Sequence, residues 1–452
     1  MNISKHPEVL KMSRLAREIT YGSLLRFSAP TILSFVFLNI YFIIDGIFVA
    51  QAVGTTGLAA VNITMPILGV MLALATMMNT GGSALMASLL GRGKVDTARK
   101  GFAFLLFSCV AGSALLAALA LLFMRPLLWM LGADAELLPI CEAYITPLVI
   151  AGPFIMGGMI LDGFLLVEGR PILSMASSLF GGFVNIALDY VFMFRWGMGI
   201  EGAGIASGIG YSVSAVIGLF YFGVWRKGTL VLVRPLPLWG ILRRSASNGI
   251  SEMVSMLSSS VVIVALNNIM MELAGEDGVA AISITQYVEA LLTSVYLGYA
   301  EGVAPLTSYN HGARDVGKIR RIFRFSLRIV AGFGLVTFLL GFLVAEPVAA
   351  AFAEGNEAVR EMAVHGFYIF AFNFLFVGFS IYASSFFTAL NDGRMSALLS
   401  FCHTIVFLLG MLLLLPRFFG VDGVWMASPV AEILAMGLAF WMLREKGKVY
   451  GK

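Results

Sequence analysis

The chain has 452 residues, of which 59% are hydrophobic and only 12% are charged. The charged share is about half that of an average soluble protein, so the composition excludes a nucleic-acid-binding protein, a disordered protein and an ordinary cytosolic enzyme. Apolar runs of about 20 residues recur along the chain, and a run of this length crosses a bilayer as a helix. We therefore predict an all-α integral membrane protein.

Twelve membrane-spanning helices are predicted from the apolar runs, joined by short loops. In chain order they cover residues 28–51, 58–89, 101–124, 138–165, 172–194, 203–224, 246–271, 279–308, 324–345, 363–390, 395–416 and 423–442. Pro30, at the start of the first span, is ordinary for a helix start, but a kink there could also gate the lobe.

The sequence repeats itself at a constant offset. Three segments return 221 residues later: 57–64 as 278–285, 91–95 as 312–316, and 199–207 as 420–428. Two repeats in the same orientation are typical of transporters. We therefore divide the chain into an amino-terminal segment (1–27), an amino-terminal lobe of six helices (28–224), a linker (225–245), a carboxyl-terminal lobe of six helices (246–442) and a tail (443–452).

The basic residues are distributed unevenly about the predicted spans. With the amino terminus inside, all but four of the 30 Lys and Arg residues fall in cytoplasmic segments, and the exceptions are Arg125, Arg195, Arg360 and Arg417. Because Lys and Arg accumulate on the cytoplasmic side of membrane proteins, we expect both termini in the cytoplasm. The net charge of +4 is thus a topology signal and does not indicate a nucleic-acid partner.

Carboxylates, but no Lys or Arg, lie well inside the predicted spans. They are Asp45, Asp189, Glu252, Glu289, Glu301 and Glu432, with Asp162 nearer the cytoplasmic end of the fourth span. An intramembrane carboxylate is costly and by default marks an ion or substrate path. A single one is as easily a protonated packing group, but six without a basic partner favour proton exchange, Na⁺ binding or attraction of an organic cation.

Polar residues near Asp189 extend this hypothesis. Asn185 lies four residues before Asp189 and shares its helical face, so the pair could hold one small cation or relay protons. Asn185 could also only link helices, and Ser207 could add a hydroxyl or serve as a small packing residue. His403 has no acid one helical turn away, and we interpret it as a packed or hydrogen-bonded core histidine.

Several segments resemble the multidrug and toxic compound extrusion (MATE) transporters. Residues 45–61 are similar to the first-span signature of that family, 185–189 and 202–207 to its fifth and sixth spans, and 305–313 to its MepA-like branch. The resemblance implies a V-shaped bundle of two six-helix lobes that works by alternating access. It also implies export of organic cations in exchange for H⁺ or Na⁺.

The resemblance assigns roles to single residues. The amino-lobe cation pocket of the family maps onto Asp45, Asn185, Asp189 and Ser207, with a further position at Asp162 or Gly163, and the span-7 acid of the family matches Glu252. The chain also departs from the family. No acid occurs in 378–387, where some sodium-driven members have one, Glu301 replaces a usual Gln, and Leu166 replaces a frequent Arg.

These observations together predict a cation-coupled antiporter and not an enzyme. We expect a monomeric, multi-pass protein of the bacterial inner (plasma) membrane that needs no cofactor and binds no metal beyond Na⁺ at Asp45, Asn185 and Asp189. Glu252, Glu289, Glu301 and Glu432 would attract small-molecule organic cations. The alternatives are an exporter of one endogenous metabolite and a flippase for a lipid-linked precursor, which would need basic residues inside the spans.

Overall fold

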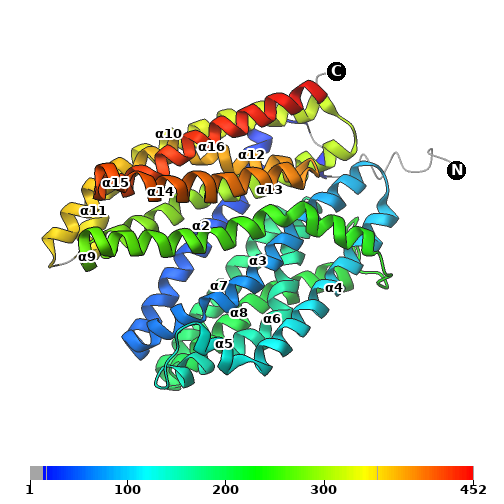
Figure 1. Ribbon diagram of the computed structural model, residues 1–452. Coiled ribbons are helices and arrows are strands. Elements are labelled where there is room, and N and C mark those ends of the chain that lie inside the picture. The colour runs from blue at the N-terminus through cyan, green and yellow to red at the C-terminus, as the bar shows by residue number, and fades with distance from the viewer. Residues whose placement is uncertain (1–13, 17, 354, 451–452) are drawn as a thin grey trace. The chain divides into compact units, whose positions relative to one another are not determined.

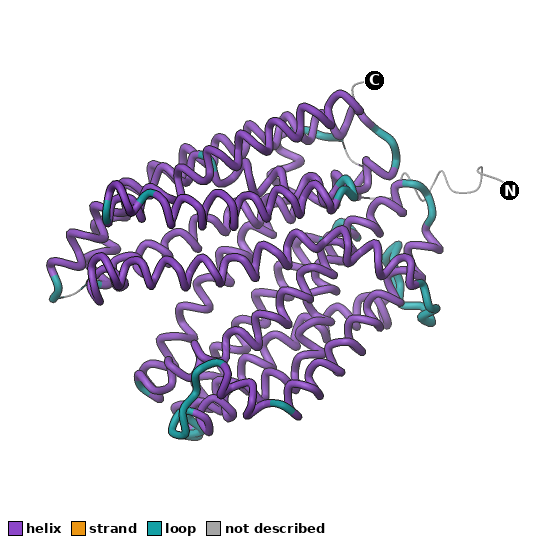
Figure 2. The backbone as a smooth tube through the Cα atoms, viewed as in Figure 1, coloured by secondary structure: helices purple, strands orange, loops and turns teal. Residues whose placement is uncertain are grey.

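The computed structural model describes residues 14–16, 18–353 and 355–450, and the predicted terminal segments 1–27 and 443–452 lie partly outside them. Every element within the described residues is a helix and none is a strand (Figure 2). A lipid environment favours this outcome, because each backbone N–H and C=O must find its partner within the chain. The prediction of an all-α membrane protein is confirmed.

The helices follow the predicted spans closely (Figure 1). The first half contains η2 (Arg14–Ala16), α2 (Tyr21–Val53), α3 (Thr55–Gly91), α4 (Val95–Leu122), α5 (Met124–Met130), α6 (Leu138–Val167), α7 (Pro171–Asp189), η3 (Tyr190–Arg195), α8 (Ile200–Leu219) and η4 (Phe220–Trp225). The second half contains α9 (Trp239–Gly312), α10 (Val316–Phe352), α11 (Glu357–Phe370), η5 (Ala371–Leu375), α12 (Val377–Ala389), α13 (Gly393–Phe401), η6 (Cys402–Leu409), α14 (Gly410–Leu414), α15 (Pro416–Phe419) and α16 (Val421–Tyr450).

Eleven described helical segments are long and apolar enough to cross a membrane. The number is one below the twelve predicted spans because α9 contains both the seventh and the eighth span. Its helical geometry breaks at Gly275, where φ is 63° and ψ is −152°. Residues with a side chain rarely adopt these backbone angles, so a glycine at this position allows the chain to reverse direction.

The chain forms two compact units. The first comprises Leu33–Gly249 and Ser308–Arg314 beside residues of the amino terminus, and the second comprises Glu18–Ile32, Ile250–Thr307 and Asp315–Lys452. Two long helices, α2 and α9, therefore contribute residues to both units. The predicted lobes, 28–224 and 246–442, do not have the boundaries of these two units, which lie inside α2 and α9. The division into lobes stays a prediction.

In the first unit, α6 packs against α3, α4, α7 and α8. Its residues Tyr144, Leu148 and Val149 are fully buried and belong to the main apolar cluster. In the second unit, α16 packs against α11, α12, η6 and α14. Large apolar side chains such as Leu122, Ile150 and Leu343 are instead exposed on the helices, as expected for a surface that faces lipid.

Glycines bring helices into backbone contact inside the first unit. A methyl group at Gly81 of α3 would lie 2.0 Å from the carbonyl oxygen of Ser245 on α9. A methyl group at Gly91 would lie equally close to the Tyr309 carbonyl, and one at Gly312 equally close to the Ser88 carbonyl. Small residues at helix crossings are a common means of packing membrane helices, because apolar side chains gain nothing from leaving lipid.

The linker begins against the end of α6. The Glu168 carboxylate accepts hydrogen bonds from the backbone N–H groups of Thr229 at 2.9 Å and Leu230 at 2.5 Å. Arg99 Nε donates to the Thr229 carbonyl at 2.7 Å. Burial raises the pKa of Glu168, although the two backbone hydrogen bonds act in the opposite direction. The segment after Trp225 is thus held to the first unit through its backbone N–H groups and through a backbone carbonyl.

Candidate functional site

In the first unit, three helices bring the predicted coupling residues together. Asp45 comes from α2, Asn185 and Asp189 come from the last turns of α7, and Ser207 comes from α8. All four are buried, with Asp189 wholly inaccessible. Asn185 Nδ2 donates a hydrogen bond to Ser207 Oγ over 3.1 Å, which joins α7 to α8.

The oxygens of this group are largely without hydrogen bonds. Asp45 Oδ1, Asn185 Oδ1 and both carboxylate oxygens of Asp189 are buried and have no donor among the described residues. The carboxyl groups of Asp45 and Asp189 nevertheless lie within hydrogen-bonding reach of each other. Because ionised carboxylates only accept, two of them can face each other closely only with a proton or another cation between them.

Tyrosines complete the surroundings of the acid pair, and the sequence analysis did not identify them. Tyr41, Tyr144 and Tyr211 are all within electrostatic reach of Asp45. The rings of Tyr41 and Tyr211 meet edge to face, with 6.4 Å between their centroids. Tyr41 precedes Asp45 by four residues, and this spacing could have revealed it. Tyr144 and Tyr211 come from other helices and left no local signal.

Asp162 lies in a different polar group of the first unit. Its Oδ2 accepts a hydrogen bond from Ser178 Oγ at 3.2 Å, and Ser177 and Ser214 are within hydrogen-bonding reach. At the neighbouring position, a methyl group on Gly163 would lie only 1.8 Å from Asn79 Oδ1. The side chain of Asn79, on α3, therefore fills the space beside Gly163.

In the second unit, His403 has an acidic partner from another helix. His403 Nε2 on η6 and Glu432 Oε1 on α16 share a hydrogen bond of 2.6 Å. Glu289 of α9 interacts electrostatically with both. Sequence spacing could not reveal this group, because its three members come from three helices.

The remaining predicted acids, Glu252 and Glu301, are both on α9. They lie within electrostatic reach of each other, so the two halves of α9 run side by side after the break at Gly275. Pro30 lies inside α2, which continues through it as one helix from Tyr21 to Val53. The boundary between the two units follows Ile32, two residues after the proline.

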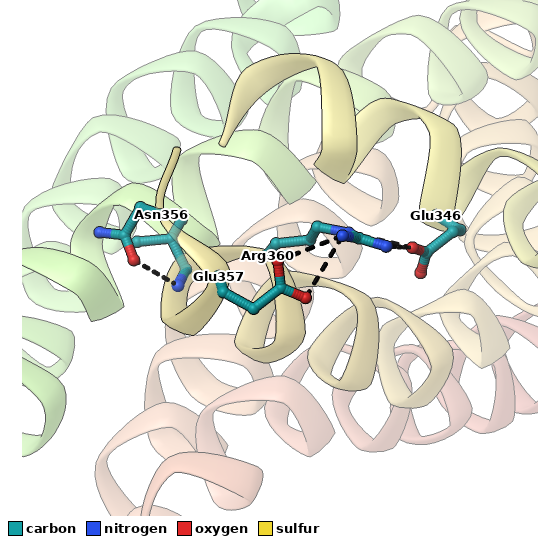
Figure 3. A network of polar contacts seen from close by, with 5 residues as sticks. Glu346, Asn356, Glu357 and Arg360 are labelled. Atoms are coloured by element: carbon teal, nitrogen blue, oxygen red, sulfur yellow. Dashed lines mark hydrogen bonds and ion pairs between the residues drawn. The ribbon is translucent and has the colours of Figure 1, made fainter. Parts of the chain in front are cut away.

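Two of the four basic residues that depart from the charge asymmetry are neutralised. Arg125 Nε donates to Glu142 Oε1 at 2.8 Å. Arg360 forms ion pairs with Glu346 and Glu357 beside the cap residue Asn356 (Figure 3). Both arginines form these pairs at the exposed surface, where ion pairs contribute little to stability.

A family model matches the chain twice. The model, MatE, matches residues 30–191 and again 252–413. The two matches begin 222 residues apart, in agreement with the repeat found in the sequence.

Curated relatives match over nearly the whole chain. The multidrug export protein MepA of Staphylococcus aureus (strain bovine RF122 / ET3-1) is 21% identical over 94% of each chain. MepA of Staphylococcus saprophyticus subsp. saprophyticus is 22% identical over the same shares.

Solved structures share the fold. A crystal structure of MATE in complex with MaL6 superimposes with a TM-score of 0.93 at 22% identity, covering 97% of this chain and 99% of that one. An outward-facing multidrug resistance MATE family transporter of the MOP superfamily gives a TM-score of 0.90 at 23% identity, with 97% and 98% coverage.

Proposed function

Because the chain belongs to the MatE family, we propose that it exports amphipathic organic cations across a bacterial plasma membrane in exchange for H⁺ or Na⁺. Multidrug export proteins among its relatives support the cargo class. The family is one of transporters, so the chain is not an enzyme. The protein acts as a monomer with both termini in the cytoplasm, and the asymmetry of its basic residues supports this orientation.

The buried pair Asp45–Asp189 carries the proposal of cation coupling. Asp45, Asn185 and Asp189 together carry four buried oxygens without donors among the described residues. Leaving them empty is costly, since each buried polar group without a partner costs about 1–3 kcal/mol. One proton shared by the two carboxyls satisfies part of the group, and Na⁺, a hard cation that takes oxygen ligands, could satisfy all of it.

The cargo class follows from the sign of the buried charge in the spans. In the second unit, Glu252 interacts electrostatically with Glu301, and Glu289 with Glu432. These acids favour cations over neutral molecules. A flippase for a phosphorylated lipid precursor would need the opposite charge, whereas an exporter of a single metabolite would recognise few compounds in a panel of cationic dyes.

Transport by the purified protein in liposomes tests the proposal. The protein is reconstituted in liposomes and efflux of a cationic dye is followed after imposing a proton gradient, a sodium gradient or neither. We expect dye movement with one of the two gradients and none without. Equal dye movement under all three conditions would contradict antiport, and the gradient that works identifies the ion.

A further inference from the structure

His403 lies beside two acids, Glu432 and Glu289, in a cluster that the coupling site does not use. Its imidazole is hydrogen-bonded to Glu432 Oε1, while Glu432 Oε2 is buried and has no hydrogen-bond donor among the described residues. Glu432 is 4% exposed, whereas the side chain of His403 is 23% exposed. The histidine is therefore the more exposed partner of the pair, and the more deeply buried Glu432 keeps one oxygen unsatisfied.

The internal repeat relates one member of this cluster to a neighbour of the coupling site. Glu432 corresponds to Tyr211 at the offset of 221 residues, and Tyr211 lies near Asp45 in the first unit. A π-helix also occurs in each of the two regions, although at different positions of the repeat. A π-helix, η3, begins directly after Asp189, and another, η6, begins one residue before His403. Such π-helical turns are rare and occur frequently at functional sites.

The charges around His403 are few and acidic. Glu289 of α9 and Glu432 of α16 are the charged groups that act on it. The elements packed against η6 are α13, α14 and α16. Of their other described charged side chains, Arg394 is at the start of α13, Asp422 is in the first turn of α16, and Arg444 is more than three turns beyond Glu432. Among the described residues, no group of His, Cys, Asp and Glu side chains has the geometry of a metal site.

We propose that Glu432 and Glu289 form a binding site for organic cations, and that protonated His403 occupies this site when no cargo is bound. An organic cation binds there only when His403 loses its proton. This inference rests on the proposed export of organic cations and names the site in the second unit. With the imidazole protonated, His403 satisfies Glu432 and excludes a second cation. Without that proton, Glu432 is free to pair with cargo.

The charges balance in this exchange. The imidazolium of His403 donates its hydrogen bond to the Glu432 carboxylate in the cargo-free site. A monovalent cargo takes over the pairing with Glu432 and Glu289, and the imidazolium releases one proton to water. One positive charge enters and one leaves, so the cluster keeps its net charge. Cargo binding at this site therefore releases a proton without involving Asp45 or Asp189.

Two substitutions of opposite kind test the proposal. His403→Gln can still hydrogen bond but is never charged, whereas His403→Lys stays charged. Binding of tetraphenylphosphonium, a cation that cannot titrate, is measured with the purified full-length protein at pH 6 and pH 8.5. We expect the wild type to bind like His403→Lys at pH 6, at least about tenfold more weakly than His403→Gln. At pH 8.5 it should bind like His403→Gln.

The ratio of the tetraphenylphosphonium affinities of His403→Gln and wild type decides whether His403 competes with cargo. If this ratio is the same at both pH values, His403 does not compete with cargo and the proposal is wrong, even if His403→Lys fails to fold. Glu432→Gln should bind the probe weakly at both pH values, and unchanged binding would equally overturn the site. If the wild type binds no probe at either pH, it is the proposed export of organic cations that fails.

Discussion

Asp189 lies where α7 changes into the π-helix η3, and its position decides what the acid pair can do. The wider turn of a π-helix displaces the following side chains relative to an α-helix. Asp189 itself is the last residue of α7, one turn from Asn185, and its carboxyl group reaches Asp45 on α2. Asp189, at the end of α7, thus interacts with both Asn185 and Asp45.

Replacing Asp189 with Asn tests this role. Asp189→Asn keeps the shape and the hydrogen-bonding capacity of the side chain but removes its charge and its exchangeable proton. We expect gradient-driven dye efflux in proteoliposomes to fall by at least about tenfold, equivalent to about 1.4 kcal/mol. The matched control is Glu201→Gln, an exposed acid at the start of α8, which should transport normally. Near-normal efflux by Asp189→Asn would assign coupling to another acid.

The sequence predicted the members of the coupling group but not all of its partners. Asn185 and Asp189 share a face through local spacing, and the acids stand out because charges are rare within spans. The hydrogen bond between His403 and Glu432 and the electrostatic interaction between Glu252 and Glu301 join residues 29 and 49 positions apart. Such contacts depend on how whole helices pack, and periodicity within one helix carries no information about them.

At the scale of elements, helix crossings depend on the absence of side chains. Gly81 and Gly69 are both in α3, but only Gly81 is pressed against a neighbouring backbone, that of α9. Around Gly69 a methyl group would meet nothing within 4 Å. The two positions therefore separate the effect of packing from the effect of glycine on helix stability.

Alanine substitutions at these two glycines should have opposite effects. Gly81→Ala forces α3 away from α9 and should destabilise the protein by about 1–3 kcal/mol. Gly69→Ala fills open space and should stabilise it by about 0.4–1 kcal/mol, because it restricts the unfolded chain. Thermal unfolding of the purified variants measures both. Equal shifts of Tm in the same direction would show that the close contact at Gly81 is unimportant.

The attachment of the linker makes a second prediction for elements. Glu168→Ala leaves the N–H groups of Thr229 and Leu230 without their acceptor, at a cost of about 1–3 kcal/mol each when such groups stay buried. We expect the segment to detach instead, so that trypsin cleaves after Arg226 or Lys227 at least about fivefold faster. Glu201→Ala is the control. If both variants are cleaved at the wild-type rate, Glu168 does not hold the linker.

For the whole molecule, orientation is the property that the basic residues predict. Lys227 lies in the linker and Trp196 in the loop before α8, and both are exposed. The charge asymmetry assigns the first to the cytoplasm and the second to the opposite side.

Cysteine labelling in intact cells tests the orientation. In a chain without Cys109, Cys141 and Cys402, an impermeant maleimide should label Trp196→Cys and leave Lys227→Cys unlabelled. Opening the cells should make Lys227→Cys react as well, which controls for its accessibility. Labelling of Lys227→Cys from outside would invert the predicted topology.

The contribution of α2 to the second unit sets an order for biosynthesis. A methyl group at Gly302 would lie 2.8 Å from the Cα atom of Ser28, and one at Gly298 would lie 2.5 Å from that of Ile32. A ribosome adding about 5–20 residues per second makes Gly298 roughly 14–54 s after Ser28. During that interval the first turns of α2 wait in the membrane without their native neighbours. A nascent chain stalled before α9 therefore cannot form these contacts between α2 and α9.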